Sequence, residues 1–225
     1  MSILYIVATP IGNLEDITLR ALRILKEVDL ILCEDTRVTK RLLDNYSIKK
    51  PTLSYHQHSR FKKIDYIVDL LKSGKNLALV SDAGTPGISD PGSKLVSEIV
   101  KQCDNVAISS ISGPSAITAA ASISGFPMDK FIFMGFPPTK KGRQKYFKEV
   151  VASKYPVIFY ESPHRITKTL NELRIMNHEL RIAVCRELTK KFETVYRGDI
   201  SEVIEQIEND KIKGEFVVVT EADRC

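Results

Sequence analysis

The chain has 225 residues, of which 43% are hydrophobic and 27% charged, and its formal net charge is +5. This composition is typical of a folded globular protein and excludes a disordered or fibrous chain. The longest apolar runs are strand-sized, well below the roughly 20 residues of a membrane span, and the amino terminus does not look like a signal peptide. We therefore expect a cytoplasmic protein with no membrane partner, whose positive charge permits contact with a polyanion.

In the first half of the chain, short apolar runs alternate with stretches of helical periodicity. We predict strands near 3–8, 30–33, 51–55, 76–81 and 106–111, with helices near 17–28, 36–46, 61–73 and 93–103. Such alternation is typical of a parallel sheet. One face of the first helix carries apolar residues that we expect in the core: Ile17, Ala21, Ile24, Leu25 and Val28.

The second half begins with a helix of small residues near 115–124. It continues with strands near 130–135, 156–160, 180–186, 192–197 and 215–220, and with helices near 140–153, 164–176 and 200–209. The strands near 180–186 and 192–197 follow each other without a helix between them and are expected to form a hairpin, which predicts a mixed sheet. The expected fold is therefore two α/β domains, 1–113 and 114–225, with a ligand cleft between them.

Three strands of the first half end in loops rich in glycine and proline, at 9–13, 81–92 and 112–115. Glycine permits close backbone approach and proline stiffens the chain, so these loops predict a pre-formed ligand site at the carboxyl edge of the sheet. Plain strand-to-helix turns without a ligand are the alternative. The phosphate-binding Walker loop and the dinucleotide Gly-x-Gly-x-x-Gly pattern do not occur, which favours a ligand without phosphates, such as S-adenosylmethionine.

The cysteines are widely separated and include no Cys-x-x-Cys pair, so they predict neither a zinc site nor a disulfide framework; they are Cys33, Cys103, Cys185 and Cys225. His56 and His58 have a spacing that could place both rings on one side of a strand. No third ligand is evident. We expect no metal site.

Several longer motifs carry a resemblance to a known family: Thr9-Pro10-Ile11-Gly12-Asn13, Cys33-Glu34-Asp35-Thr36-Arg37, Ser112-Gly113-Pro114-Ser115-Ala116, Ser162-Pro163-His164-Arg165 and Cys185-Arg186-Glu187-Leu188. Through them the chain resembles the ribosomal RNA small subunit methyltransferase I family, within the tetrapyrrole-methylase-like group of S-adenosylmethionine enzymes. The resemblance implies two α/β domains, a homodimer, and methyl transfer to the ribose 2′-oxygen of a cytidine in the decoding region of 16S rRNA. S-adenosylhomocysteine would be the product, and the substrate would be free 16S rRNA or the assembled small subunit.

The resemblance also implies a set of cofactor-binding residues: Pro10, Val80, Ser81, Asp82, Ile88, Ser115, Ala116, Glu161 and Leu188. In this set Asp82 has a carboxylate that could hold the amino group or the ribose of S-adenosylmethionine, or could instead cap its own loop. Many relatives continue with a helical extension, whereas this chain stops soon after Thr220. Any RNA contact made by that extension is expected to be missing or relocated.

Methyl transfer to an alcohol requires alignment and a group that accepts the proton, and it requires no metal. The acids and the histidine at predicted strand ends are candidates for that base: Glu34, Asp35, His56, Glu161 and Glu187. We favour Glu34 or Glu187. In the alternative interpretation these acids pair with nearby arginines and brace the structure.

Basic residues that could contact RNA phosphates are Arg37, Lys140, Lys141, Arg143 and Arg165. A solvated helix face would explain the run near 140–148 equally well. Two other functions remain open. One is a methyltransferase of the same fold that acts on a tetrapyrrole precursor or modifies a protein as in diphthamide formation, and the other is a nucleoside-binding protein without catalysis.

Overall fold

The computed structural model describes residues 1–56 and 61–222, so His58 and Cys225 lie outside the described residues. The chain divides into two compact units, Met1–Ser115 and Ala116–Cys225. Among the described residues, no helix is long and apolar enough to cross a membrane. Cys33, Cys103 and Cys185 are buried and unpaired by disulfides.

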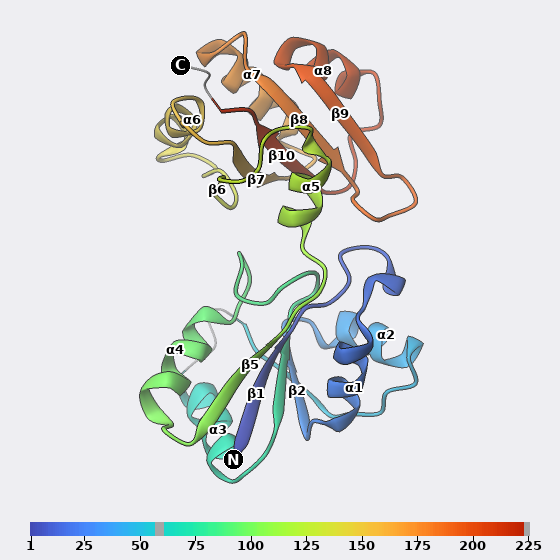
Figure 1. Ribbon diagram of the computed structural model, residues 1–225, viewed down its shortest axis with the longest axis vertical. Coiled ribbons are helices and arrows are strands. Elements are labelled where there is room, and N and C mark those ends of the chain that lie inside the picture. Colours follow the sequence, from blue (N-terminus) through green and yellow to red (C-terminus); the bar gives the residue numbers. More distant parts are fainter. Residues whose placement is uncertain (57–60, 223–225) are drawn as a thin grey trace. The chain divides into compact units, whose positions relative to one another are not determined.

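The first unit contains a five-stranded parallel sheet in the order β3-β2-β4-β1-β5 (Figure 1). Its strands are β1 (Ser2–Val7), β2 (Leu30–Cys33), β3 (Thr52–Ser54), β4 (Leu77–Val80) and β5 (Val106–Ile111). Its helices are η1 (Leu14–Asp16), α1 (Leu19–Glu27), α2 (Thr36–Asn45), α3 (Phe61–Lys72) and α4 (Ser93–Gln102). The predicted alternation and the parallel sheet are confirmed.

Both faces of this sheet are covered, as the near-continuous apolar strands require. Apolar side chains of α1 and α2 pack on one face, and those of α3 and α4 pack on the other (Figure 1). The predicted apolar face of α1 is buried as expected, from Ile17 to Val28. The helix begins only at Leu19, because the Thr18 hydroxyl caps it by accepting a hydrogen bond from the Ala21 amide at 3.1 Å.

The second unit contains a five-stranded mixed sheet in the order β6-β7-β10-β8-β9. Its strands are β6 (Ile132–Phe133), β7 (Val157–Glu161), β8 (Arg181–Arg186), β9 (Thr194–Asp199) and β10 (Phe216–Thr220). Its helices are α5 (Ala116–Ser124), α6 (Arg143–Val151), α7 (Ile166–Met176) and α8 (Ile200–Glu208). β6 and β7 are parallel, whereas the other neighbouring strands are antiparallel, which confirms the mixed sheet.

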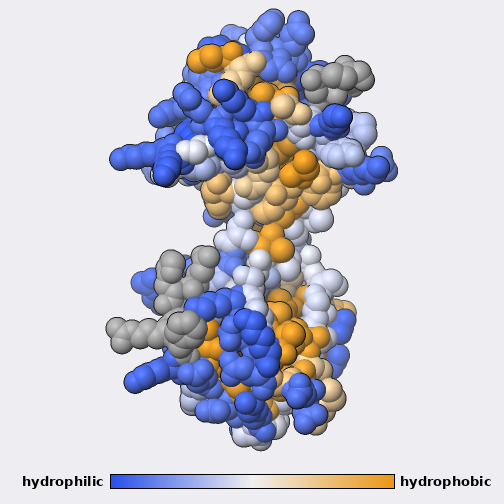
Figure 2. All heavy atoms as spheres, turned by 90° about the vertical axis from the view of Figure 1, so that its left-hand side faces the viewer, coloured by the Kyte–Doolittle hydropathy of each residue, from blue (hydrophilic) through white to orange (hydrophobic). Residues whose placement is uncertain are grey.

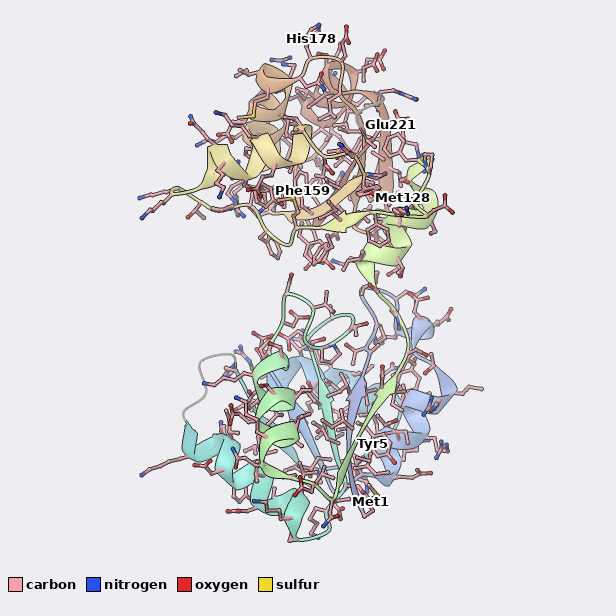
Figure 3. All side chains as sticks on the ribbon, turned by 60° about the vertical axis from the view of Figure 1, so that its left-hand side comes forward. Met1, Tyr5, Met128, Phe159, His178 and Glu221 are labelled. Atoms are coloured by element: carbon pink, nitrogen blue, oxygen red, sulfur yellow. The ribbon has the colours of Figure 1, made fainter. Side chains whose placement is uncertain are left out.

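Helices α6, α7 and α8 pack on one face of the second sheet, and Phe159 lies in the core between them and the strands (Figure 3). His178 lies in the turn after α7 with an 84% exposed side chain. Apolar surface remains visible on this unit (Figure 2), where exposed residues include Phe131, Ile132 and Phe136.

Two predicted elements of the second unit are longer than the observed ones. β6 spans two residues instead of six, because Gly135 has a φ of +64° that turns the chain out of the extended conformation. The predicted helix 140–153 begins at Arg143, after Gly142 with a φ of +85°. Both glycines adopt the left-handed region, which ends regular structure locally.

Candidate functional site

The carboxyl ends of β1, β4 and β5 carry loops that are bonded to one another. Thr9 and Gly84 exchange two backbone hydrogen bonds at 2.9 and 3.0 Å, and the Thr9 hydroxyl donates to the Ser81 carbonyl at 3.0 Å. The Thr85 hydroxyl donates to the Pro114 carbonyl at 3.4 Å. These contacts hold the three glycine- and proline-rich loops together, as expected for a pre-formed site.

Close backbone approach explains two of the glycines in these loops. A Cβ on Gly113 would lie 3.1 Å from the Ala8 Cβ, tighter than ordinary packing allows. Gly84 has a φ of +79°, and a Cβ there would lie 3.4 Å from the Ile11 Cγ2. Both positions therefore favour glycine for steric reasons.

A cavity of about 160 Å³ lies beside these loops, between them and α2. Thr9, Pro10, Ser81 and Asp82 line it on the loop side, and Thr39 is among the α2 residues that line it. Pro10 is buried and Ser81 is 3% exposed, with the Ser81 hydroxyl bonded to the Ala83 and Gly84 carbonyls. The Ser81 side chain thus forms hydrogen bonds within its own loop, whereas Asp82 is exposed to solvent.

Three carboxyl groups gather at the ends of β2 and β4: Glu34, Asp82 and Asp90. Burial and the negative charges of Glu34 and Asp82 raise the pKa of Asp90 to about 6, although a hydrogen bond with Ser81 lowers it. Burial and the charge of Asp82 also raise the pKa of Glu34, with His56 acting in the opposite direction. These groups therefore create a negative potential that a bound cation would relieve.

Asp35 lies next to Glu34 but in a different electrostatic state. Its carboxylate accepts hydrogen bonds from the Arg37 side chain, the shortest at 2.6 Å, and from the Arg37 amide at 2.8 Å. These bonds hold the pKa of Asp35 well below its usual range. Its amide donates to Asp82 at 3.1 Å, so Asp35 connects the β2 loop to the β4 loop.

In the second unit, Glu161 ends β7 inside a buried network. Its carboxylate, 0% exposed, accepts hydrogen bonds from the Thr169 hydroxyl at 2.6 Å and the Ser162 amide at 2.7 Å, and pairs with Arg165 at 2.8 Å. Glu161 is one of the predicted cofactor-binding residues, and protein groups contact both oxygens of its carboxylate, so the cofactor contact stays a prediction. Sequence reasoning did not find Thr169, which completes the network from one helix turn away.

Arg143, a predicted RNA contact, belongs to the same network. The residue is 6% exposed, and its guanidinium donates to Glu172 at 2.7 Å, to Thr169 at 2.6 Å and to the Pro138 carbonyl at 3.1 Å. The guanidinium therefore binds protein groups inside the fold, and the RNA contact stays a prediction. The Arg165 side chain is 25% exposed and donates to the Pro137 carbonyl at 3.1 Å. Lys140 and Lys141 are exposed.

Glu187 follows β8 with a φ of +52°. Its carboxylate accepts hydrogen bonds from Lys190 at 2.9 Å and from the Glu215 amide at 3.0 Å. Burial raises the pKa of Glu187, but these two bonds outweigh burial and leave the pKa below its usual value. Any Cβ on Gly214 would overlap this carboxyl group, so the cluster requires glycine there.

The remaining predicted site residues differ in their exposure. Ile88 is 44% exposed, whereas Val80 and Leu188 are 2% and 7% exposed. Ser115 and Ala116 are half-buried. Among the described residues, no group of three or more His, Cys, Asp or Glu side chains could hold a metal ion.

A five-stranded parallel α/β unit joined to a mixed α/β unit defines a class of methyltransferase folds that solved structures also show. The chain is similar to uroporphyrin-III-C-methyltransferase from Thermus thermophilus, with a TM-score of 0.66 and 16% identity over 97% of this chain and 94% of that one. It is also similar to the methyltransferase CobJ, with a TM-score of 0.71 and 16% identity over 99% and 95% of the two chains. At this identity the likeness shows the fold alone.

The model of the family Tetrapyrrole (Corrin/Porphyrin) Methylases matches residues 3–204. Ribosomal RNA small subunit methyltransferase I from Thermotoga maritima is 47% identical over 219 residues, covering 97% of this chain and 98% of the relative. The protein of that name from Bacillus subtilis is 46% identical over 224 residues, covering 98% and 75%. This chain belongs to the tetrapyrrole methylase family and, within it, to the ribosomal RNA small subunit methyltransferase I family, and it is a methyltransferase.

Proposed function

We propose that this protein transfers a methyl group from S-adenosylmethionine to the ribose 2′-oxygen of a cytidine in the decoding region of 16S rRNA. Within the structure, the observation that carries the proposal is the set of hydrogen-bonded glycine- and proline-rich loops after β1, β4 and β5, with the carboxyl groups of Glu34, Asp82 and Asp90 beside them. Support also comes from relatives at 44–47% identity over nearly the whole chain that are named as enzymes acting on small subunit rRNA. The proposal includes a cytoplasmic homodimer, as the resemblance implies.

The residues at this edge fit S-adenosylmethionine chemically. The molecule carries a sulfonium and an ammonium group, and when bound it supplies an electrophilic methyl group. Carboxylates that repel one another are stabilised by such positive charges, so Asp82 and Asp90 are the residues that would hold them. The tightly bonded loops around Pro10 and Gly84 would receive the ligand with little rearrangement.

Glu34 is the residue that we assign as general base. A base is more effective when its pKa lies nearer the working pH, and the pKa of Glu34 is raised whereas that of Glu187 is lowered. Lys190 and the Glu215 amide also occupy the Glu187 carboxylate. The Glu34 carboxylate would accept the proton of the ribose 2′-hydroxyl. Glu187 and Glu161 then have a structural role, because they bind neighbouring protein groups.

The alternative, a tetrapyrrole or diphthamide methyltransferase of the same fold, has less support. Solved structures titled uroporphyrin-III-C-methyltransferase and cobalt precorrin-4 methyltransferase share 16% identity with this chain, whereas relatives named ribosomal RNA small subunit methyltransferase I share 44–47%. Methylation of small subunit rRNA is therefore the better-supported function.

The experiment is to incubate the purified protein and S-adenosylmethionine with small ribosomal subunits, and separately with free 16S rRNA, both from cells that lack this protein. Mass spectrometry of RNA fragments then locates any new ribose methyl group. We expect one modified cytidine in the decoding region on at least one of the two substrates. An absence of methyl transfer to either would refute the proposal.

A further inference from the structure

A groove of about 550 Å³ lies on the first unit, between α2 and the segment that leads into β3. Its lining shares no residue with the loops after β1 and β4. The groove adjoins the acidic edge described above, because Arg37 lines the groove and pairs with Asp35, but the carboxyl groups of Glu34, Asp82 and Asp90 are not in its lining. Its volume is within the range of small-molecule sites and is large enough for several phosphate-sized groups.

Four cationic side chains and one carboxylate line this groove: Arg37, Lys40, Lys49, Lys50 and Asp44. The Arg37 guanidinium, 86% exposed, uses its Nε and Nη2 atoms on Asp35. Within the part of the chain that the structure describes, Lys40, Lys49 and Lys50 take part in no ion pair. The groove therefore carries a net positive charge, which Asp44 in its lining, the pairing of Arg37 with Asp35 and the charge of Asp29 near Lys50 offset only in part.

The local fold explains why these residues meet. Arg37 and Lys40 lie three residues apart on α2, and hence on one face of the helix. After α2, the Ser47 amide donates to the Asp44 carbonyl at 3.1 Å and the Ile48 amide donates to the Leu43 carbonyl at 2.8 Å. This Schellman pattern reverses the chain direction at Ser47, whose φ is +53°.

Burial of Ile48, at 5% exposure, fixes the turn against the helix. The following residues, Lys49 and Lys50, are thereby held beside Lys40 along one groove. The arrangement is rigid in its backbone, while the lysine side chains remain flexible point charges. Lysine ammonium groups bind phosphate as point charges, which does not require one fixed geometry of the phosphate.

We infer that this groove binds the phosphodiester backbone of the RNA substrate, an inference that rests on the proposed function. Phosphate contacts position an RNA without reading its sequence, which is the role that flexible lysines can fill. The acidic edge is unsuited to this role because it repels phosphate. The molecule would therefore use separate surfaces for the sulfonium cation and for the polyanion.

The test uses the full-length double variant Lys40→Glu/Lys49→Glu and a matched control, Lys62→Glu/Lys72→Glu. Lys62 and Lys72 are exposed on α3, which packs on the opposite face of the sheet from α2. Both variants change the charge by the same amount at exposed positions, where substitutions have small effects on stability. Thermal unfolding verifies that both remain folded.

Binding of each protein to small ribosomal subunits from cells lacking the protein is measured from about 50 to about 300 mM salt. We expect the groove variant to bind about 10-fold more weakly or worse at low salt, with a slope of log affinity against log salt reduced by about 1 to 2. The control should stay within about two-fold, with the wild-type slope. Equal slopes in all three proteins, or equal losses in the two variants, would overturn the inference.

Methyl transfer by the same proteins separates the two proposals. If the wild type modifies the subunits and the groove variant has a raised KM with an unchanged kcat, both proposals hold. Should the wild type modify them while the groove variant keeps the wild-type KM, only the groove inference fails. A wild type that binds subunits but transfers no methyl group to them or to free 16S rRNA refutes the proposed function itself.

Discussion

The two units contain acidic residues in opposite electrostatic states. At the edge of the first sheet, burial and neighbouring carboxylates raise the pKa values of Glu34 and Asp90. In the second unit, Arg143, Arg165 and Lys190 neutralise Glu161 and Glu187. Carboxylates that pair with cationic side chains stabilise the fold. Carboxylates that repel one another destabilise it, and binding of a cationic ligand or a proton removes that repulsion.

Removal of charge from the buried network should give the largest effect on stability. In Glu161→Gln, the partly buried Arg165 loses its charged partner at 2.8 Å, and the buried Arg143 loses a carboxylate at 3.9 Å while it keeps Glu172 at 2.7 Å. We expect the free energy of unfolding to fall by about 3 kcal/mol, measured by urea denaturation. Glu27→Gln, in an exposed pair with Arg23, is the control and should cost less than about 0.5 kcal/mol. Similar losses of unfolding free energy in both variants would mean that the buried network does not stabilise the fold.

A methyl group at Gly214 should displace the Glu187 carboxyl group and break its two hydrogen bonds. We expect Gly214→Ala to lower the free energy of unfolding by about 2 kcal/mol, which combines lost hydrogen bonds with strain at a φ of +95°. The double variant Glu187→Ala/Gly214→Ala should cost less than the sum of the single variants, because the clash is then absent. Additive losses would show that the two residues do not interact.

Asp90→Asn should stabilise the protein at neutral pH. A carboxyl whose pKa is raised to about 6 contributes stability only while it is protonated, and this is lost as the pH rises from about 4 to 6. Because solvent partly screens Asp90, we expect a gain of about 1 kcal/mol near pH 7.5 that vanishes below about pH 4. Thermal unfolding across pH measures it.

Glu187→Gln provides the contrast, since the lowered pKa of Glu187 contributes stability above its unfolded pKa. This variant should lose stability at neutral pH and match the wild type only in acid. If Asp90→Asn and Glu187→Gln shift stability in the same direction at neutral pH, the proposed contrast between the two units is wrong.

The smallest effect concerns the turn that forms the basic groove. Ser47 has a φ of +53°, which glycine adopts without strain. Ser47→Gly should raise the free energy of unfolding by about 0.5 kcal/mol without changing RNA affinity, whereas Ser47→Val should lower it by about 1 kcal/mol. Differential scanning calorimetry and subunit binding check both expectations. A loss of stability in Ser47→Gly would contradict the assigned turn.

Periodicity was sufficient to predict both sheets, because each buries continuous or alternating apolar strands that are local features of the sequence. The roles of Arg143 and Glu161 were not predictable in the same way. Arg143 belongs to a run of basic residues, and only packing against Thr169 and Glu172 reveals that its charge is internal. The residues next to Arg143 in the sequence do not indicate which side chains it contacts in the folded protein.

Asp90 illustrates the same limit at the candidate site. It lies in a predicted ligand loop, but its raised pKa depends on burial and on the charge of Glu34, which is distant in sequence and follows β2, a strand that pairs with β4. The one available signal was that both residues follow predicted strands of a parallel sheet. Strand order, which the sequence did not specify, decides which of those ends are neighbours.

The most direct test of the account compares single-turnover methyl transfer to small ribosomal subunits by the wild type, Glu34→Gln and Glu187→Gln, with calorimetry of S-adenosylmethionine binding to each. We predict that Glu34→Gln loses about 100-fold or more in rate with unchanged affinity for S-adenosylmethionine, because a general base contributes that much. Glu187→Gln should stay within about ten-fold of the wild type. A fast Glu34→Gln enzyme beside an inactive Glu187→Gln enzyme would contradict the assignment of the acidic edge as the reactive site.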